Sequence, residues 1–459
     1  MVAAAGTSMR APGDGGLDAI VVGLGATGLS CARFLAARGL SVAVTDSRAE
    51  PPGRAAIARE LPHVPLTLGA FDRDMLRAAR MVVVSPGVAL EDPRLAGAID
   101  AGADVVGDIE LFARHANAPV IAITGSNGKS TVTTLVGRMF QAAGLDVGVG
   151  GNLGTPALDL LREPAPAAYV LELSSFQLLT TRTLDAKVAT VLNVSPDHLD
   201  RHPSIEEYAR AKARIFRGRG AMVLNAEDPM VESMRIHGRE TLRFAVRRDA
   251  ALDYAVIERD GADWIGRAGE PLMPVADLGI RGRHNVANAL AACALAACGG
   301  VPDPAQAAAL REFRGLPHRA QHVASIRGVD YIDDSKGTNV GATCAAIAGM
   351  DAYDRVVLIA GGEGKGQSFA PLADLARARL RAAVLIGVDA PRIAEAVGGN
   401  TLVECAHGMD EAVVAAARLA RPGDAVLLSP ACASFDMFAN YVARGEAFAA
   451  SVGRLRGTA

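Results

Sequence analysis

A lysine that follows a glycine-rich turn is the first feature of this sequence with the chemistry of a catalytic site. The apolar run 119–123 predicts a buried strand, the turn 125–128 ends it, and an amphipathic stretch then extends to residue 143. Backbone N–H groups at such a turn bind anions, a lysine there reaches β- and γ-phosphates, and a hydroxyl can bind Mg²⁺. We therefore predict a nucleotide phosphate site formed by Gly125, Ser126, Asn127, Gly128, Lys129, Ser130 and Thr131.

The turn departs from the common P-loop pattern at its first position. That pattern, G-x-x-x-x-G-K-[ST], requires glycine at position 123, where this chain has Ile123, and the first glycine here is Gly125. The alternative is a glycine turn before an ordinary helix, with no ligand. A lysine directly after glycine at a strand-to-helix turn has few structural roles, so the phosphate site is the favoured interpretation.

Two residues further along the chain, one within a predicted strand and one after a strand, could bind a cation. Glu172 lies within the apolar run 169–173, where an unpaired carboxylate would be costly, and a Mg²⁺ ligand beside a phosphate loop would explain it. The alternative is an edge-strand acid that faces water. His198 follows the strand predicted for 187–193 and could also ligate a metal, although a lone loop histidine is more often solvated.

A lysine on the next helix has no obvious role. The pattern predicts a helix over 204–216, with Ser204 as its N-cap. Lys212 lies on this helix among alanines and aromatic residues, and composition alone makes it a surface lysine.

A second glycine-rich turn lies near the N-terminus. A strand at 19–22 is followed by Gly-Leu-Gly-Ala-Thr-Gly at 23–28, a helix to about residue 38, a strand at 41–44 and then Asp46, 18 residues after Gly28. This is a Rossmann-like G-x-G-x-x-G pattern. It predicts a nucleotide diphosphate at the loop, with Asp46, Ser47 and Arg48 near the nucleoside. An NAD enzyme and a tight turn without ligand are the alternatives.

Polar residues gather at other predicted strand ends and helix starts. The strand 81–84 ends in Ser85-Pro-Gly87, and Asn285 and Asn288 share one face at the start of an alanine-rich helix. The two amides could contact a base or a phosphate, or could be ordinary helix-start residues. The segment 335–339 is predicted to open a helix after the strand that ends at residue 334. Four more residues at strand ends suggest a small acidic ligand, namely Lys336, Thr338, Lys365 and Ser434.

Composition limits the class of protein. A length of 459 residues suggests about three domains. Half of the residues are hydrophobic and 21% are charged, as expected for a globular protein, and a net charge of −3 argues against a general nucleic-acid binder. Six cysteines form no C-x-x-C pair, which favours reduced thiols in the cytoplasm. No apolar run reaches the length of a membrane span, and residues 1–17 lack the apolar segment of a signal peptide.

Taken together, seven motifs resemble those of the Mur ligases. They are residues 124–131 (TGSNGKST), 172–175 (ELSS), 197–200 (DHLD), 282–288 (GRHNVAN), 316–319 (LPHR), 334–336 (DSK) and 429–435 (SPACASF). The resemblance runs from about residue 19 to the C-terminus. The order and number of the motifs make a coincidental match very improbable.

The resemblance implies three α/β domains, and the composition of residues 1–17 predicts a flexible tail before them. The tail would be residues 1–17, followed by a Rossmann-like domain for a UDP-linked substrate at 18–116. A central P-loop ATPase-like domain would occupy 117–316. A Rossmann-like domain for an amino acid would occupy 317–459.

The implied activity is an ATP-dependent ligase of peptidoglycan precursor synthesis. It would add D-glutamate to UDP-N-acetylmuramoyl-L-alanine through an acyl phosphate and release ADP and phosphate, as a cytoplasmic monomer without nucleic-acid or membrane partners. A sibling Mur ligase or a folylpolyglutamate synthase-like ligase with another amino acid is the alternative.

The resemblance also assigns residues to each ligand. The catalytic residues would be Lys129, Glu172, His198 and Lys212. ATP would lie on the phosphate loop and contact Asn285, Asn288, Arg319 and Asp334. Two Mg²⁺ ions would be bound by Ser130, Thr131, Glu172, His198 and a CO₂-derived carbamate on Lys212. The UDP substrate would contact Gly25, Ala26, Thr27, Asp46, Ser47, Arg48, Ser85, Pro86, Gly87, Asn152, Ser174, Gln177 and His198. D-Glutamate would contact Lys336, Thr338, Lys365, Ser434 and Phe435.

Overall fold

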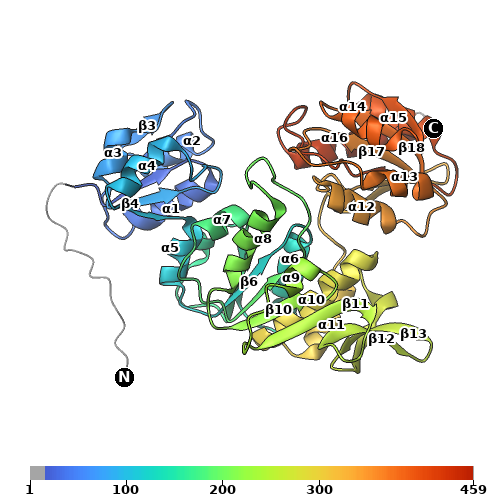
Figure 1. The fold of residues 1–459 in the computed structure, drawn as a ribbon, viewed down its shortest axis with the longest axis horizontal. Helices are drawn as coiled ribbons and strands as arrows, with labels where there is room; N and C mark the ends of the chain where they lie inside the picture. Colours follow the sequence, from blue (N-terminus) through green and yellow to red (C-terminus); the bar gives the residue numbers. More distant parts are fainter. Residues whose placement is uncertain (1–15, 458–459) are drawn as a thin grey trace. The chain divides into compact units, whose positions relative to one another are not determined.

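The computed structural model describes residues 16–457, so most of the tail predicted for 1–17 lies outside it. By its contacts the chain forms two units. The first contains the chain up to Asn117 together with Gly154–Glu163 and Phe176–Leu184, and the second contains the remainder. Figure 1 shows the course of the chain through its helices and strands.

The first unit is a five-stranded parallel sheet in the order β3-β2-β1-β4-β5. Its strands are β1 (Ala19–Val22), β2 (Val42–Asp46), β3 (Leu66–Leu68), β4 (Met81–Val84) and β5 (Asp104–Val106). Its helices are α1 (Ala26–Ala36), α2 (Arg54–Glu60), α3 (Arg73–Ala78), α4 (Pro93–Asp100) and α5 (Asp108–His115). The strands β1 and β4 are continuous runs of aliphatic residues, as expected for strands covered on both faces.

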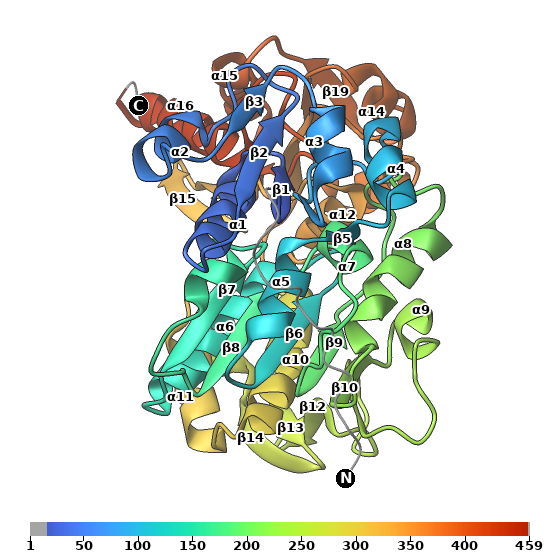
Figure 2. The same cartoon turned by 90° about the vertical axis from the view of Figure 1, so that its left-hand side faces the viewer.

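The second unit contains a nine-stranded sheet in the order β14-β13-β12-β11-β10-β9-β6-β8-β7. Strands β7 to β10 lie side by side with β6 in Figure 2. The strands are β6 (Val120–Thr124), β7 (Val147–Gly151), β8 (Ala168–Glu172), β9 (Val188–Val191), β10 (Ala221–Asn225), β11 (Thr241–Arg248), β12 (Tyr254–Arg259), β13 (Ala262–Arg267) and β14 (Glu270–Pro274). The pairings β12–β13 and β13–β14 are antiparallel, and the other pairings are parallel.

Helices α6 and α10 bury most of the core of this sheet. The helices around it are α6 (Lys129–Ala142), α7 (Ser175–Leu179), α8 (Ile205–Ala213), α9 (Pro229–Glu232), α10 (Arg283–Gly299) and α11 (Asp303–Glu312). Val132, Leu135 and Phe140 of α6 share a core with the alanine-rich face of α10. Small side chains let α10 pack closely, and this fixes the start of α10 beside the phosphate loop.

The second unit also contains a six-stranded sheet in the order β15-β16-β20-β17-β18-β19. Its strands are β15 (Gln321–Ile326), β16 (Val329–Asp333), β17 (Val356–Gly361), β18 (Leu380–Ile386), β19 (Leu402–Cys405) and β20 (Ala425–Leu428). Its helices are α12 (Val340–Ala348), α13 (Leu372–Arg379), α14 (Ala390–Val397), α15 (Met409–Leu419) and α16 (Tyr441–Gly457). Only the edge strand β15 runs antiparallel to its neighbour.

These three sheets with helical layers confirm the predicted α/β class. The domain boundaries at 116/117 and 316/317 stay predictions. All six cysteines are free thiols. Within residues 16–457, no helix combines the length and apolar character needed to cross a bilayer.

Candidate functional site

The phosphate loop joins β6 to α6 in a conformation that requires glycine at its end. Gly128 has a φ of +83°, and a Cβ at this position would lie 2.4 Å from Oδ1 of Asn288. Lys129 is the first residue of α6, and its Nζ donates to the carbonyl oxygens of Gly125 and Ser126 at 2.8 Å. Burial lowers the pKa of Lys129, and the nearby cations Arg319 and Lys365 lower it further. The loop therefore holds a desolvated cation at a helix N-terminus.

Residues after β9, which the sequence did not single out, fix the shape of this loop. Asn193 accepts from the N–H of Asn127 at 2.8 Å and donates back to its carbonyl oxygen at 3.1 Å. Ser126 Oγ accepts from the N–H of Ser195 at 2.9 Å. Because β9 and β6 are adjacent parallel strands, their carboxyl ends meet, and that placement is the signal that could have identified these residues.

Glu172 ends β8 with one oxygen engaged and the other without a partner. Its side chain is buried, and Oε1 accepts from Nδ2 of Asn152 at 2.7 Å. Within residues 16–457, its buried Oε2 has no hydrogen-bond partner. The alternative of an edge acid facing water is therefore wrong. An orphaned carboxylate oxygen beside a phosphate loop fits a hard cation such as Mg²⁺.

Lys212 is buried, so the interpretation from composition as a surface lysine is wrong. Only 1% of the residue is exposed, its Nζ donates to the carbonyl oxygen of Gly125 at 2.9 Å, and Nζ lies 4.3 Å from the ring centroid of Tyr208. Burial, and then the charge of Lys129, hold the pKa of Lys212 well below its usual range. The predicted N-cap of its helix is confirmed, because Ser204 Oγ accepts from the N–H of Glu207 at 3.3 Å.

His198 lies in the loop after β9, in a strained backbone conformation. It has a φ of +57°, and its Nε2 lies 3.7 Å from Oδ2 of Asp197. Burial lowers the pKa of His198 to about 4, so the ring is neutral at neutral pH and able to ligate a metal. In the part of the chain that the structure describes, no group of three or more His, Cys, Asp or Glu residues forms a metal site on its own. A metal here would need hydroxyls, ligand oxygens or a modified side chain.

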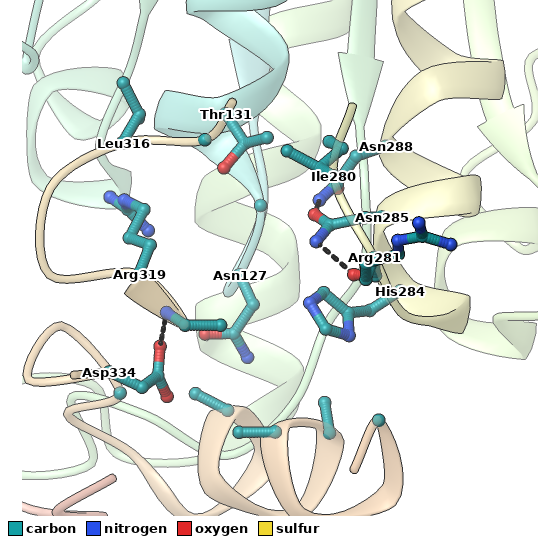
Figure 3. Close-up of a pocket in the computed structure, with 18 of the residues that line it drawn as sticks. Asn127, Thr131, Ile280, Arg281, His284, Asn285, Asn288, Leu316, Arg319 and Asp334 are labelled. Carbon is teal, nitrogen blue, oxygen red and sulfur yellow. Dashed lines mark hydrogen bonds between the residues drawn. The ribbon is translucent and has the colours of Figure 1, made fainter. Parts of the chain in front are cut away.

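A cavity of about 790 Å³ lies next to the phosphate loop. Figure 3 shows Arg319 and Asp334 on one side of it and the start of α10 on the other. The residues that line it include Asn127, Gly128, Thr131, Asn285, Asn288, Arg319, Asp334 and Lys336. The structure therefore brings together most of the residues predicted for ATP.

The two asparagines of α10 both line the cavity and are hydrogen-bonded to each other. Asn285 Nδ2 donates to the carbonyl oxygen of Arg281 at 2.7 Å, and Asn288 Nδ2 donates to Oδ1 of Asn285 at 3.0 Å. His284, which the sequence analysis did not select, also lines the cavity, and its buried Nδ1 has no hydrogen-bond partner within residues 16–457. Its place beside Asn285 in the GRHNVAN motif was the available signal.

Across the cavity, Arg319 donates through Nη2 to Ser130 Oγ at 2.7 Å. Asp334 accepts from Ser429 Oγ at 2.7 Å, and burial raises the pKa of this carboxyl to about 7. Burial and the neighbouring cations Arg319, Lys129 and Lys365 lower the pKa of Lys336 to about 8. Lys129, Arg319, Lys336 and Lys365 thus form one group of interacting cations, which we call the cation cluster.

The residues predicted for D-glutamate lie after strands of the third sheet, but not in identical settings. Lys336 Nζ lies 4.3 Å from the ring centroid of Tyr441, and Lys365 Nζ is paired with Asp197 Oδ1 at 3.0 Å. Ser434 is buried, whereas 72% of Phe435 is exposed. The helix expected to open at residue 335 begins at Val340 instead, with Asn339 as its N-cap. Lys336 and Thr338 therefore lie in the preceding turn.

The residues predicted for the UDP substrate are divided between the two units. Gly25, Ala26 and Thr27 lie at the start of α1, and Ser47, Ser85, Pro86, Gly87 and Gln177 also belong to the first unit. Asn152, Ser174 and His198 belong to the second.

In the first unit, Asp46 is held by local partners. It accepts from the N–H of Leu24 at 2.7 Å and from Arg48 Nη2 at 2.7 Å. The hydrogen bonds from Arg48 lower the pKa of Asp46 to about 2. Asp46 thus holds Arg48 near the glycine loop, because it accepts hydrogen bonds from both.

Profiles of three Mur ligase domains match the chain in order. The MurD-like N-terminal domain matches residues 18–107, the Mur ligase middle domain 123–296, and the glutamate ligase domain 318–432. These matches coincide with the three sheets described above.

Curated relatives match nearly the whole chain. UDP-N-acetylmuramoylalanine–D-glutamate ligase from Nitrosococcus oceani is 53% identical over 94% of this chain and 96% of its own length. The protein of the same name from Methylococcus capsulatus is 52% identical over 94% of each chain.

Solved structures share the fold at low identity. UDP-N-acetylmuramate-alanine ligase from Thermotoga maritima has a TM-score of 0.61 at 19% identity, covering 96% of this chain and all of its own. MurF ligase from Thermotoga maritima, solved with ADP, has a TM-score of 0.60 at 16% identity, covering 84% of this chain and 91% of its own. With relatives of this identity along nearly its full length, the chain belongs to the Mur ligase family.

Proposed function

We propose that this protein joins D-glutamate to UDP-N-acetylmuramoyl-L-alanine, with conversion of ATP to ADP and phosphate. The observation that carries the proposal is that relatives about 50% identical over almost the whole chain are D-glutamate ligases by name. The cation cluster fits this reaction, because the nucleotide phosphates and both carboxylates of D-glutamate are anionic. A sibling ligase with another amino acid is not favoured by these relatives.

The reaction divides into two steps that need positioning and charge neutralisation. A carboxylate oxygen of the substrate's alanine attacks the γ-phosphorus of ATP, the bond to the β-phosphate oxygen breaks, and ADP leaves. The amine of D-glutamate then attacks the carbonyl carbon of the acyl phosphate, loses a proton, and phosphate leaves as the amide forms. Lys129 and Arg319 would neutralise the phosphates, which is the main contribution of protein to phosphoryl transfer.

The remaining residue roles are proposals supported by position. Asn285, Asn288 and Asp334 line the cavity beside the phosphate loop and would contact ATP. Lys336, Thr338, Lys365, Ser434 and Phe435 would contact D-glutamate. The glycine loop of α1 with Ser47, Arg48, Ser85, Pro86 and Gly87, and Asn152, Ser174, Gln177 and His198, would contact the UDP substrate.

Two Mg²⁺ ions fit the donors present. Ser130 or Thr131 with Glu172 would hold one ion, and His198 with a carbamate on Lys212 would hold the other. Mg²⁺ supplies charge neutralisation to phosphate oxygens. The support for these assignments is the unpartnered oxygen of Glu172 and the buried amine of Lys212. A monomeric state and a cytoplasmic location stay predictions.

The decisive experiment measures phosphate release from ATP with UDP-N-acetylmuramoyl-L-alanine and a panel of amino acids. We expect release with D-glutamate and none with L-glutamate, L-lysine or diaminopimelate. Equal rates with L-glutamate or L-lysine would identify a sibling ligase. Calorimetry with NAD addresses the other alternative, because tight NAD binding without binding of the UDP substrate would contradict the proposal.

A further inference from the structure

A buried arginine on α16 contacts all three loops that carry the proposed D-glutamate residues. Arg444 is 1% exposed. Its guanidinium donates to Ser335 O at 2.9 Å, to Cys432 O at 3.1 Å and to Ala433 O at 3.3 Å. It also reaches Ser335 Oγ at 3.1 Å and Gly361 O at 3.5 Å. Every guanidinium nitrogen therefore has an acceptor.

Two of the acceptors stand directly before proposed ligand residues in the chain, and Gly361 lies at the end of β17, four residues before Lys365. Ser335 precedes Lys336, Gly361 begins the segment that ends at Lys365, and Ala433 precedes Ser434. These loops follow β16, β17 and β20, which are neighbours in the sheet. A planar guanidinium with five donors in a rigid fork suits acceptors on three separate loops better than the compact ammonium of lysine.

The loops are also joined to each other around Arg444. Glu363 and Ala433 exchange two backbone hydrogen bonds, of 3.0 and 2.8 Å. Ser335 Oγ donates to Tyr441 O of the same helix at 2.7 Å. Helix α16 comes so close that a Cβ on Gly445 would lie 2.2 Å from Nδ1 of His318. The close approach to His318, which lies outside the three loops, helps to fix the position of Arg444.

From this geometry we infer that Arg444 is the positioning residue of the amino-acid site, setting the distance between the lysines and the hydroxyls that hold D-glutamate. The inference rests on the proposed D-glutamate site. Within the described chain, the guanidinium bonds carbonyl oxygens and one hydroxyl but no carboxylate. Burial lowers the pKa of Arg444 to about 10, so it stays a cation at neutral pH and adds positive potential for an anionic ligand.

The test is Arg444→Lys, which keeps the charge but cannot reach all three loops. Misplacing binding groups by about 1 Å costs up to about 100-fold, so we expect the KM for D-glutamate to rise about tenfold or more. The KM values for ATP and for the UDP substrate should stay within about twofold. Incorporation of labelled ADP into ATP, with the UDP substrate and without D-glutamate, should also persist, because that step does not use these loops.

Arg381→Lys is the matched control. Arg381 pairs with buried Asp424 at the opposite end of the same sheet, with Nη2 to Oδ1 at 2.9 Å. It should lower the melting temperature without a selective change in the KM for D-glutamate. A folded Arg444→Lys protein with an unchanged KM for D-glutamate, or with equal rises in all three KM values, overturns the inference.

A second variant covers the case in which Arg444→Lys does not fold. Ser335→Ala removes one acceptor of Arg444 and should raise the KM for D-glutamate selectively, though less. An unchanged KM in this variant would then overturn the inference. Failure of the unmodified protein to use D-glutamate would instead contradict the proposed function, so the two failures are distinguishable.

Discussion

Lys212 has the environment of a lysine that reacts as a neutral amine. It is buried beside Tyr208, its Nζ donates to the carbonyl oxygen of Gly125 on the phosphate loop, and the charge of Lys129 opposes its protonation. A neutral amine is the form that attacks CO₂. The product is an anionic oxygen ligand of the type that Mg²⁺ prefers.

We therefore predict that Lys212→Ala loses most ligase activity, by about 100-fold or more, while remaining folded. Formate or acetate should restore part of the activity by filling the vacated anion site. Lys212→Arg should be as inactive as Lys212→Ala, because arginine keeps its positive charge and cannot be carbamylated. Phosphate release measures the activity of each variant, and circular dichroism shows whether it is folded.

Lys187, an exposed lysine at the start of β9, provides the control. Lys187→Arg should be fully active. Full activity of Lys212→Arg would show that no carbamate forms there, and Glu172, His198 and water would have to hold the metal.

Asp108 gives the first unit an unusual pH dependence. It is buried at the start of α5, and Oδ2 accepts from Gln177 Nε2 at 2.9 Å. Burial raises the pKa of Asp108 from 3.8 to about 6. The folded state therefore keeps a proton that the unfolded chain releases, and stability present below pH 4 is lost as pH rises through 6.

The prediction is that Asp108→Asn stabilises the first unit at pH 8, by at most about 3 kcal/mol for a pKa difference of this size. The variant should also flatten the fall in stability between pH 4 and 6. Hydrogen exchange of peptides from β1 to β5, corrected for the intrinsic effect of pH, measures this.

Asp104→Asn is the opposite control, since Asp104 Oδ2 pairs with Arg114 Nη1 at 2.8 Å and its pKa is lowered. It should destabilise the unit at pH 8. A destabilised Asp108→Asn protein at pH 8 would contradict the prediction.

Single residues divide into those that the sequence could predict and those that it could not. Lys129 was predictable because its chemistry follows from its place after a glycine turn. The burial of Lys212 was not, because its contact with the phosphate loop joins residues 87 positions apart. Burial by tertiary contacts has no local signature, and composition favoured the surface for Lys212.

At the scale of elements, the strands and glycine turns were the best predicted features. The strand 19–22 matches β1, and the helix predicted after it matches α1, although α1 begins at Ala26, within the predicted loop 23–28. Continuous aliphatic runs and glycine spacing are local signals. The start of α12 was placed too early, at 335 instead of 340. Asp334 accepts from Ser429, Ser335 donates to the carbonyl oxygen of Tyr441 in α16, and Asn339 provides the cap that starts the helix.

Packing of α1 against β1 depends on Gly28, and this gives an element-scale prediction. A Cβ on Gly28 would lie 1.8 Å from the carbonyl oxygen of Gly23, a backbone atom that side-chain rotation cannot move. Gly28→Ala should therefore lower the melting temperature by several degrees, the effect of a few kcal/mol.

Gly97→Ala in α4 is the matched control. Its Cβ would meet only the flexible Arg77 side chain, with Nε at 3.0 Å. Alanine also favours a helix over glycine by about 1 kcal/mol, so this variant should be neutral or stabilising. Equal melting temperatures for Gly28→Ala and the unmodified protein would contradict the predicted close approach.

At the scale of the whole molecule, the sequence predicted three α/β domains but not how the chain is shared between units. Segments 154–163 and 176–184 belong with the first unit, although they lie between strands of the central sheet. Glu110 of α5 holds the second of these segments, accepting from the N–H of Thr183 at 2.9 Å and from Thr183 Oγ1 at 3.0 Å. Such partners, 73 positions apart, leave no periodic pattern that a sequence analysis can detect.

Within the second unit, a nearly buried ion pair joins the nine-stranded sheet to the six-stranded sheet. Asp197, in the loop after β9, accepts from Lys365 Nζ at 3.0 Å and from Asn339 Nδ2 at 3.0 Å. Their side chains are 8% exposed for Asp197 and 15% for Lys365. Burial alone would raise the pKa of Asp197, but Lys365 and His198 hold it below its usual range. The pair is thus charged, desolvated and formed by loops of both sheets.

We predict that Asp197→Asn lowers the free energy of unfolding by about 2–4 kcal/mol, because it leaves Lys365 as an unpaired cation in a nearly buried site. Lys365→Met in the Asp197→Asn background should recover part of that loss, since no buried charge then remains. Urea unfolding of the four proteins in the double-mutant cycle gives the interaction energy, expected to be about 1 kcal/mol or more. The exposed pair Arg267–Asp303, with Nη1 and Oδ1 2.7 Å apart and both side chains 46% exposed, should give less than about 0.5 kcal/mol in the same cycle. Additive effects at Asp197 and Lys365 would mean that other contacts hold the two sheets together. Lys365 could then bind a substrate carboxylate without losing a stabilising interaction with Asp197.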